Sequence, residues 1–221
     1  MARWKNESIS DYLICCFRSV YSSRYNDECD RLDKEDKGKV QEMKRLMLCI
    51  LWIIAKLRLW LEPCFFKRRA PKDWQELEDL DNWREAFDLD SDSFDYVINR
   101  LPYKADAWQG FLDYSFPIDN PEYFFKDLPY GRDCDDWTRI WCAYYRYRKM
   151  VSEEWIITTT KHPFKNSHFV AVVHEDEGYR LLDYHRWELF PTVEQAVASV
   201  CDHWTIYDPD NLLAVKYKVW T

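Results

Sequence analysis

Glycine is scarce in this 221-residue chain, which contains only four. A phosphate-binding loop needs glycines where the backbone approaches the phosphate, and neither the P-loop pattern nor G-x-G-x-x-G occurs. None of the eight cysteines forms a C-x-x-C pair, the spacing typical of structural zinc sites. The sequence therefore argues against a nucleotide-binding loop and a zinc ribbon, and it predicts no cofactor and no metal.

The chain also lacks a hydrophobic run long enough for an ordinary transmembrane helix. Its most apolar stretch, residues 46–61, would rise about 24 Å as a helix, whereas a bilayer has a hydrocarbon core of roughly 30 Å. Lys56 and Arg58 lie inside this stretch and would be costly at a membrane centre. We expect a helix packed on the rest of the protein, with a peripheral membrane or partner contact through residues 39–69 as the alternative.

The N-terminal sequence does not resemble a secretory signal. "MARWKNESISDYLICCF" has only a short apolar stretch before Arg18, too short for the apolar core of a signal peptide. We therefore expect reduced thiols and a cytoplasmic protein.

Charge is distributed unevenly along the chain. Residues 1–70 contain 15 basic and 10 acidic side chains, whereas residues 71–221 contain 16 basic and 29 acidic ones. Binding to a nucleic acid backbone needs clustered Lys and Arg, so the acidic part is a poor candidate for it. We predict no nucleic acid partner.

The order of the expected elements indicates an α+β fold. We expect helices over residues 7–25 and 39–62, then a boundary near Pro71 and further short helices. A helix over about 134–149 precedes several strand-like segments, which is typical of a helix packed on an antiparallel sheet. The prediction is a basic helical extension, residues 1–70, followed by one domain, residues 71–221.

Cys134 stands out among the cysteines because of its position at a helix start. In "PYGRDCDDWTRIW" Gly131 provides a turn and Asp133 can cap the helix, so Cys134 falls in the first helical turn. A helix N-terminus and a nearby imidazolium both favour the thiolate, which is the reactive form of a thiol. The alternative is that Cys134 is a small, buried, unreactive residue of the core, which is the usual role of cysteine.

A hairpin downstream supplies possible partners for this thiol. In "SHFVAVVHEDEGYRLLDYH" an even-numbered turn centred on Asp176-Glu177 would pair strands so that residue numbers sum to 353. His168 and Asp183 would then be diagonal neighbours on one face of the sheet. A nucleophile, a base and an orienting carboxylate would thus be available. A metal site is the alternative interpretation of these residues, with His162, His168, His174, His185 and Cys201 as its candidate ligands.

These two motifs together resemble the transglutaminase-like cysteine peptidases of the papain-like superfamily. The resemblance covers roughly residues 100–190 and implies a papain-like core. It implies that Cys134 is the nucleophile, His168 the general base and acid, and Asp183 the orienting carboxylate. Arg132 departs from the pattern, because the family often has glycine directly before the acid.

The resemblance implies acyl transfer through a thioester on Cys134. With water as acceptor the protein would be a peptidase or amidase acting on a protein or peptide substrate; with an amine it would be a transglutaminase. For the oxyanion, the sequence offers the backbone N–H of Cys134, with Trp108 or Gln109 as side-chain candidates. Two alternatives stay open: a catalytically silent binding module with the papain-like fold, and an effector that acts through a membrane or partner.

Overall fold

The structure of the chain is a computed structural model. It describes the following residues: 32–69, 82–101, 103, 116, 118–125, 132–161, 163, 167–184 and 186–221. The helix expected over residues 7–25 and the boundary expected near Pro71 lie outside the described residues.

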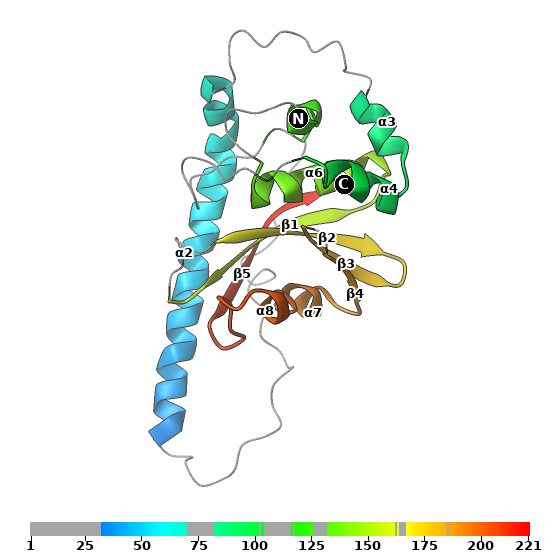
Figure 1. Ribbon diagram of the computed structural model, residues 1–221. Coiled ribbons are helices and arrows are strands. Elements are labelled where there is room, and N and C mark those ends of the chain that lie inside the picture. Colours follow the sequence, from blue (N-terminus) through cyan, green and yellow to red (C-terminus); the bar gives the residue numbers. More distant parts are fainter. Residues whose placement is uncertain are drawn as a thin grey trace.

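A five-stranded antiparallel sheet forms the centre of the fold, in the order β4-β3-β2-β1-β5 (Figure 1). The strands are β1 (Ser152–Thr159), β2 (His168–Glu175), β3 (Gly178–Asp183), β4 (Arg186–Phe190) and β5 (Leu212–Trp220). Every pairing between neighbours is antiparallel. With helices on both faces, the chain has the α+β architecture that the sequence predicts.

Helix α6 (Cys134–Tyr147) packs on one face of this sheet, together with α3 (Asn82–Asp88) and α4 (Ser91–Ile98). Side chains Asp135 to Tyr145 of α6 are all buried, so the helix is enclosed on every side. Its aromatic residues stack against α4, where the rings of Phe94 and Tyr144 lie 4.2 Å apart. This burial fixes the start of α6 firmly against the strands.

The opposite face of the sheet is covered by α7 (Val193–Ala198) and α8 (Val200–His203). Their buried residues Ala196 and Val200 share a cluster with Val170 and Val172 of β2. Alternate residues of β2 therefore face different helical layers, because successive side chains of a strand point to opposite sides.

The long helix α2 (Leu32–Arg69) lies beside α6 over the β5 edge of the sheet (Figure 1). Its residues Leu48, Leu51 and Ala55 pack in one cluster with Phe169 of β2 and Val215 of β5. The expectation of a helix packed on the rest of the protein is confirmed, and the helix extends beyond residues 39–62. Across the described ranges, every helix is too short or too polar to traverse a bilayer.

Turns and caps define the shorter elements. A turn that follows Asp183 separates β3 from β4, so residues 179–189 do not form one continuous strand. Helix α4 is capped by Asp90, whose carboxylate accepts from the N–H of Ser93. A short helix, α5 (Glu122–Phe125), precedes α6.

Candidate active site

Cys134 is the first residue of α6, as the sequence predicts. Asp133 is the N-cap: its carboxylate accepts from the N–H of Asp135, and its carbonyl accepts from the N–H of Trp137 at 3.0 Å. Cys134 is half-buried, whereas its neighbours Asp133 and Asp135 are buried. The thiol thus stands at the positive end of the helix dipole, which favours a thiolate there.

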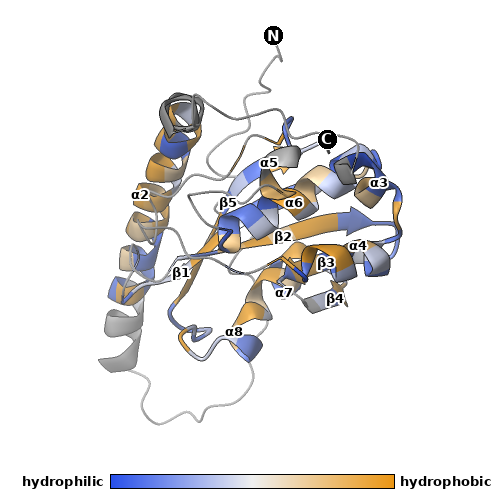
Figure 2. Ribbon diagram, turned by 45° about the horizontal axis from the view of Figure 1, so that its top comes forward, coloured by the Kyte–Doolittle hydropathy of each residue, from blue (hydrophilic) through white to orange (hydrophobic). Residues whose placement is uncertain are grey.

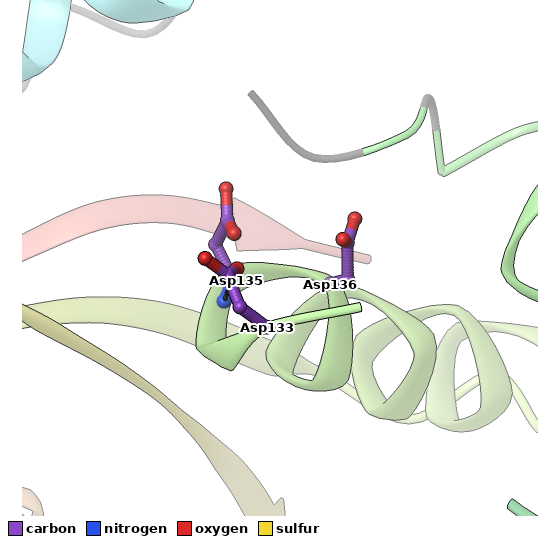
Figure 3. A group of neighbouring side chains, drawn as sticks. All are labelled: Asp133, Asp135 and Asp136. Carbon is purple, nitrogen blue, oxygen red and sulfur yellow. Dashed lines mark hydrogen bonds between the residues drawn. The ribbon is translucent and has the colours of Figure 1, made fainter. Parts of the chain in front are cut away.

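Three carboxylates gather around this helix start (Figure 3). Oxygen atoms of Asp133, Asp135 and Asp136 lie within 4.8 Å of one another. Asp133 caps the helix, and Asp135 accepts from the guanidinium of Arg58 in α2 at 2.6 Å. Capping and pairing give Asp133 and Asp135 a structural role at the start of the helix.

A hydrogen bond with Asp133 and the ion pair with Arg58 both favour the ionised form of Asp135. Burial alone would raise the pKa of this carboxyl, but the hydrogen bond with Asp133 and the charges of Arg58 and Arg139 outweigh it. The pKa of Asp135 therefore falls below its usual value. Asp135 is a buried anion next to Cys134, and Arg58 balances its charge.

The β2–β3 hairpin has the register that the sequence predicts. Ala171 pairs with Leu182 and Glu175 with Gly178, so paired residue numbers sum to 353 across a two-residue turn. His168 and Asp183 come together as expected: Nε2 of the imidazole lies 2.7 Å from Oδ1 of the carboxylate. Both residues are buried. An ionised carboxylate can only accept, so the bond places the ring proton on Nε2 and leaves Nδ1 for proton exchange.

Trp204 completes this pair, and the sequence analysis missed it. Its indole Nε1 donates to Oδ2 of Asp183 at 2.6 Å, so each oxygen of the carboxylate has a donor. The ring of Trp204 also lies 4.9 Å from that of His168. Trp204 is the residue that ends α8, and no local pattern connects it to a hairpin twenty residues earlier.

His168 and Cys134 belong to different sides of the sheet. His168 precedes Val170 by two residues and shares its side, which faces α7 and α8. Cys134 packs against the cluster of Phe169 and Ile156 on the α2 side. His168 is the first residue of β2, and Cys134 is the first residue of α6. A contact between the Cys134 thiol and the His168 imidazole would have to form around this end of the sheet.

A row of aromatic rings runs around that end and joins the two sides. The Tyr184 ring stacks 5.4 Å from His168 and lies 6.3 Å from Trp137 of α6. Burial raises the pKa of Tyr184, and negative charge on Cys134 raises it further. Burial also raises the pKa of Tyr207, and negative charge on Cys134 and Asp183 raises it further. Cys134 is therefore close enough to Tyr184 and Tyr207 for its charge to affect their ionisation.

The tyrosine hydroxyls are suited to donating hydrogen bonds here. Burial raises the pKa of both Tyr184 and Tyr207, so each keeps its proton at neutral pH. Tyr103, which is 57% exposed, lies 5.9 Å from the Tyr184 ring. Burial, and then the charges of Asp133 and Cys134, raise the pKa of Tyr103 as well. A protonated phenol near Cys134 can stabilise an anion that forms at the thiol.

Tyr184 has the left-handed backbone conformation, with φ of 53°. Residues other than glycine adopt it at a cost of about 1–2 kcal/mol, and such positions concentrate at functional sites. The turn between Asp183 and Arg186 thus directs the Tyr184 ring onto His168.

Arg58 is a second residue that sequence analysis did not connect to the site. Besides pairing with Asp135, its guanidinium lies 4.6 Å from the ring centre of Phe169 and 5.4 Å from that of Tyr217. Asp135 follows Cys134 in sequence, and Phe169 follows His168. One arginine of α2 therefore contacts the neighbours of both residues and helps to fix their separation.

Four other candidate residues, His162, His185, Trp108 and Gln109, lie outside the described residues. His174 is at the far end of β2, where its Nε2 lies 3.1 Å from Glu153.

Comparisons with protein-family models, with curated proteins and with solved structures found no match for the chain.

Two other thiols are expected to be unreactive in the folded protein. Burial raises the pKa of Cys142 well above its usual value and that of Cys201 to about 11. Iodoacetamide at pH 7.5 should therefore leave Cys142 and Cys201 unmodified, and both should react once urea unfolds the chain. Peptide mapping of the alkylated protein measures this. Rapid labelling of Cys142 in the folded state would show that α6 is less enclosed than described.

Replacing Trp204 with phenylalanine should weaken the orientation of His168. The variant keeps a ring beside the imidazole but loses the donor to Asp183. Hydrogen bonds to charged groups contribute about 1.5–3 kcal/mol, so we expect acylation of Cys134 to slow by about 10–100-fold. Stopped-flow acylation by p-nitrophenyl acetate measures it. An unchanged rate would mean that Trp204 only fills space.

Proposed function

We propose that the protein is a cysteine-dependent acyl-transfer enzyme in which Cys134, His168 and Asp183 act together. The buried 2.7 Å bond between His168 and Asp183 is the observation that carries this proposal. A buried imidazole oriented by a carboxylate, at the end of the sheet where a thiol opens a helix, is the arrangement that activates cysteine nucleophiles.

The chemistry proceeds in two steps. The Cys134 thiolate attacks the carbonyl carbon of an amide, and the imidazolium of His168 gives its Nδ1 proton to the leaving amine as the C–N bond breaks. In the second step His168 removes a proton from water, the hydroxide attacks the thioester, and the thiolate leaves. Asp183 accepts from Nε2–H throughout, so that Nδ1 remains directed to the reacting atoms.

The oxyanion formed in each step needs hydrogen-bond donors. The N–H of Cys134 lies in the first turn of α6, where backbone N–H groups have no partner within the helix. The protonated hydroxyl of Tyr184 is a further candidate, beside the side chains of Trp108 and Gln109 that the sequence suggests. Together they would stabilise negative charge beside the thiol.

The papain-like fold and the transglutaminase-like family remain part of this proposal. A helix that begins at the nucleophile and packs on an antiparallel sheet supports it. So does the order of nucleophile, base and carboxylate along the chain. Protein or peptide amides are the proposed substrates, with water as the default acceptor.

Acylation by an activated ester tests the proposal without knowledge of the natural substrate. With p-nitrophenyl acetate, the protein should release a burst of about one p-nitrophenolate per chain and carry the acetyl group on Cys134, located by peptide mapping. The Cys134→Ser variant should show no burst. Acetylation spread evenly over the cysteines would contradict the proposal.

The same assay separates the two possible acceptors. Adding glycine ethyl ester should divert the acetyl group to the amine if the protein is a transglutaminase-like acyltransferase. If water is the acceptor, the added amine should not change the rate at which the acetyl-enzyme decays.

A further inference from the structure

The outer side of α2 carries a row of exposed apolar side chains. Six of them follow each other at intervals of three and four residues, and each is 40% to 76% exposed: Met43, Leu46, Ile50, Ile53, Leu57 and Trp60. We call this row the outer stripe. It extends for about 26 Å along the helix. Figure 2 shows the middle of α2 as largely hydrophobic.

The outer stripe is not part of the core of the protein. The core side of the same helix is formed by Leu48, Leu51, Ala55 and Arg58, all of which are buried. Leu57 is thus exposed to solvent, whereas the next residue, Arg58, is buried against the site. Scattered exposed apolar residues are normal, but a contiguous row of this size on a folded protein marks an interaction surface.

The charge of α2 indicates what the surface meets. Helix α2 contains ten Lys or Arg and five acidic residues, and three of the acidic ones, Asp33, Glu35 and Asp36, lie in its first turns, before the outer stripe. Basic residues flank the outer stripe: Lys39 and Arg45 are exposed near its start, and the helix ends in Lys67, Arg68 and Arg69. The remainder of the chain, residues 71–221, is strongly acidic. An apolar row with basic ends complements an anionic lipid surface.

Trp60 is consistent with this surface. It is the most exposed apolar residue of the stripe, at 76%, and lies toward its basic C-terminal end. Indole rings favour the boundary between lipid headgroups and acyl chains. Lys56, within the stripe region, lies 5.6 Å from the Trp52 ring, and a lysine of this length can extend its ammonium to the headgroups.

A second copy of the chain fits the outer stripe less well. Two helices that pair through such a row usually carry complementary charges at the flanking positions. Here the flanking positions are Glu42, Met47, Cys49, Ile54, Lys56 and Leu61. Glu42 and Lys56 are the only charged residues among them, so most of the flanking positions offer a partner copy no complementary charge.

We infer that the outer stripe of α2 docks the folded protein on an anionic membrane surface. The helix lies in the plane of the membrane, its apolar side chains enter the headgroup region, and the basic residues that flank the stripe contact anionic lipids. The opposite side of α2 stays packed on the sheet, so docking needs no unfolding. This inference is independent of the chemistry proposed for Cys134.

Co-sedimentation with vesicles tests it. Wild-type protein should bind phosphatidylcholine vesicles in which about a third of the lipid is phosphatidylserine, and should bind pure phosphatidylcholine at least about tenfold more weakly. Ile53→Glu should lower binding to the mixed vesicles at least about tenfold, because it places a charge in the stripe. Raising the salt concentration should also weaken binding.

Ile206→Glu is the matched control. Ile206 is 53% exposed, close to the 51% of Ile53, but lies in the turn between α8 and β5. The Ile206→Glu variant should bind the vesicles like wild type, and thermal melts should show that both variants fold. The inference would be overturned if both variants lost vesicle binding equally, or if wild type did not bind the vesicles. A wild-type dimer that Ile53→Glu dissociates, without vesicle binding, would assign the stripe to a second copy instead.

Discussion

Asp183→Ala is expected to lower the rate at which p-nitrophenyl acetate acylates Cys134 by at least about 100-fold. The substitution removes the acceptor of the His168 Nε2–H and leaves the indole N–H of Trp204 without its carboxylate. The imidazole would then adopt other tautomers and orientations, and Nδ1 would no longer be directed to the thiol. Stopped-flow measurement of p-nitrophenolate release gives the rate.

Asp183→Asn is the matched comparison. The amide keeps one acceptor oxygen for two donors, His168 and Trp204, so its rate should fall between those of wild type and Asp183→Ala. Iodoacetamide labelling after unfolding should confirm an intact Cys134 in each variant. If Asp183→Ala acylates as fast as wild type, Asp183 is a structural acid of the strand end and the triad is wrong.

Arg58→Met should lower the free energy of unfolding by about 3–5 kcal/mol, the effect of leaving a buried charge without its partner. Arg58 and Asp135 are 3% and 5% exposed and are bonded at 2.6 Å. Methionine retains an apolar side chain of similar length beside Phe169. Urea unfolding at pH 7 measures the loss. The double variant Arg58→Met/Asp135→Asn removes both charges and should recover much of it.

The pH dependence separates lost charge pairing from lost packing. In wild type the pKa of Asp135 lies below its unfolded value of about 3.9, so the pair contributes fully above about pH 4 and is lost as the pH falls through the lower folded value. In Arg58→Met, the pKa of Asp135 in the folded protein should rise above its value in the unfolded chain. The free energy of unfolding of this variant should therefore increase as the pH is lowered from 7 to 5. In wild type, the Arg58–Asp135 pair should leave the free energy of unfolding unchanged over that range. An equal pH dependence of the two proteins would mean that Arg58 acts through packing alone.

The parts of the site that follow from local rules could be predicted from the sequence. Asp133 caps α6 because a short acid before an apolar run satisfies the first N–H groups of a helix. The register of the β2–β3 hairpin follows from a two-residue turn before Gly178. These two rules place Cys134 at the helix start and His168 beside Asp183.

The parts that depend on distant contacts could not be predicted. The turn after Asp183 contains neither Gly nor Pro nor Asn, and Tyr184 adopts a positive φ that tertiary contacts support. Trp204 and Arg58 reach the site from α8 and α2, which no sequence spacing connects to it. The alternation of β2 predicts that His168 faces away from Phe169, but not that aromatic rings join the two sides.

The pH dependence of Cys134 alkylation tests the proposed activation of the thiol most directly. Wild type and His168→Ala are treated briefly with substoichiometric iodoacetamide from pH 5 to 9 and analysed by intact mass and peptide mapping. We expect Cys134 of wild type to label first, at a pH well below the value near 8.5 of an ordinary thiol, and His168→Ala to lose this advantage. Labelling of Cys134 no faster than Cys49, in both proteins, would contradict an activated thiol and with it the proposed enzyme.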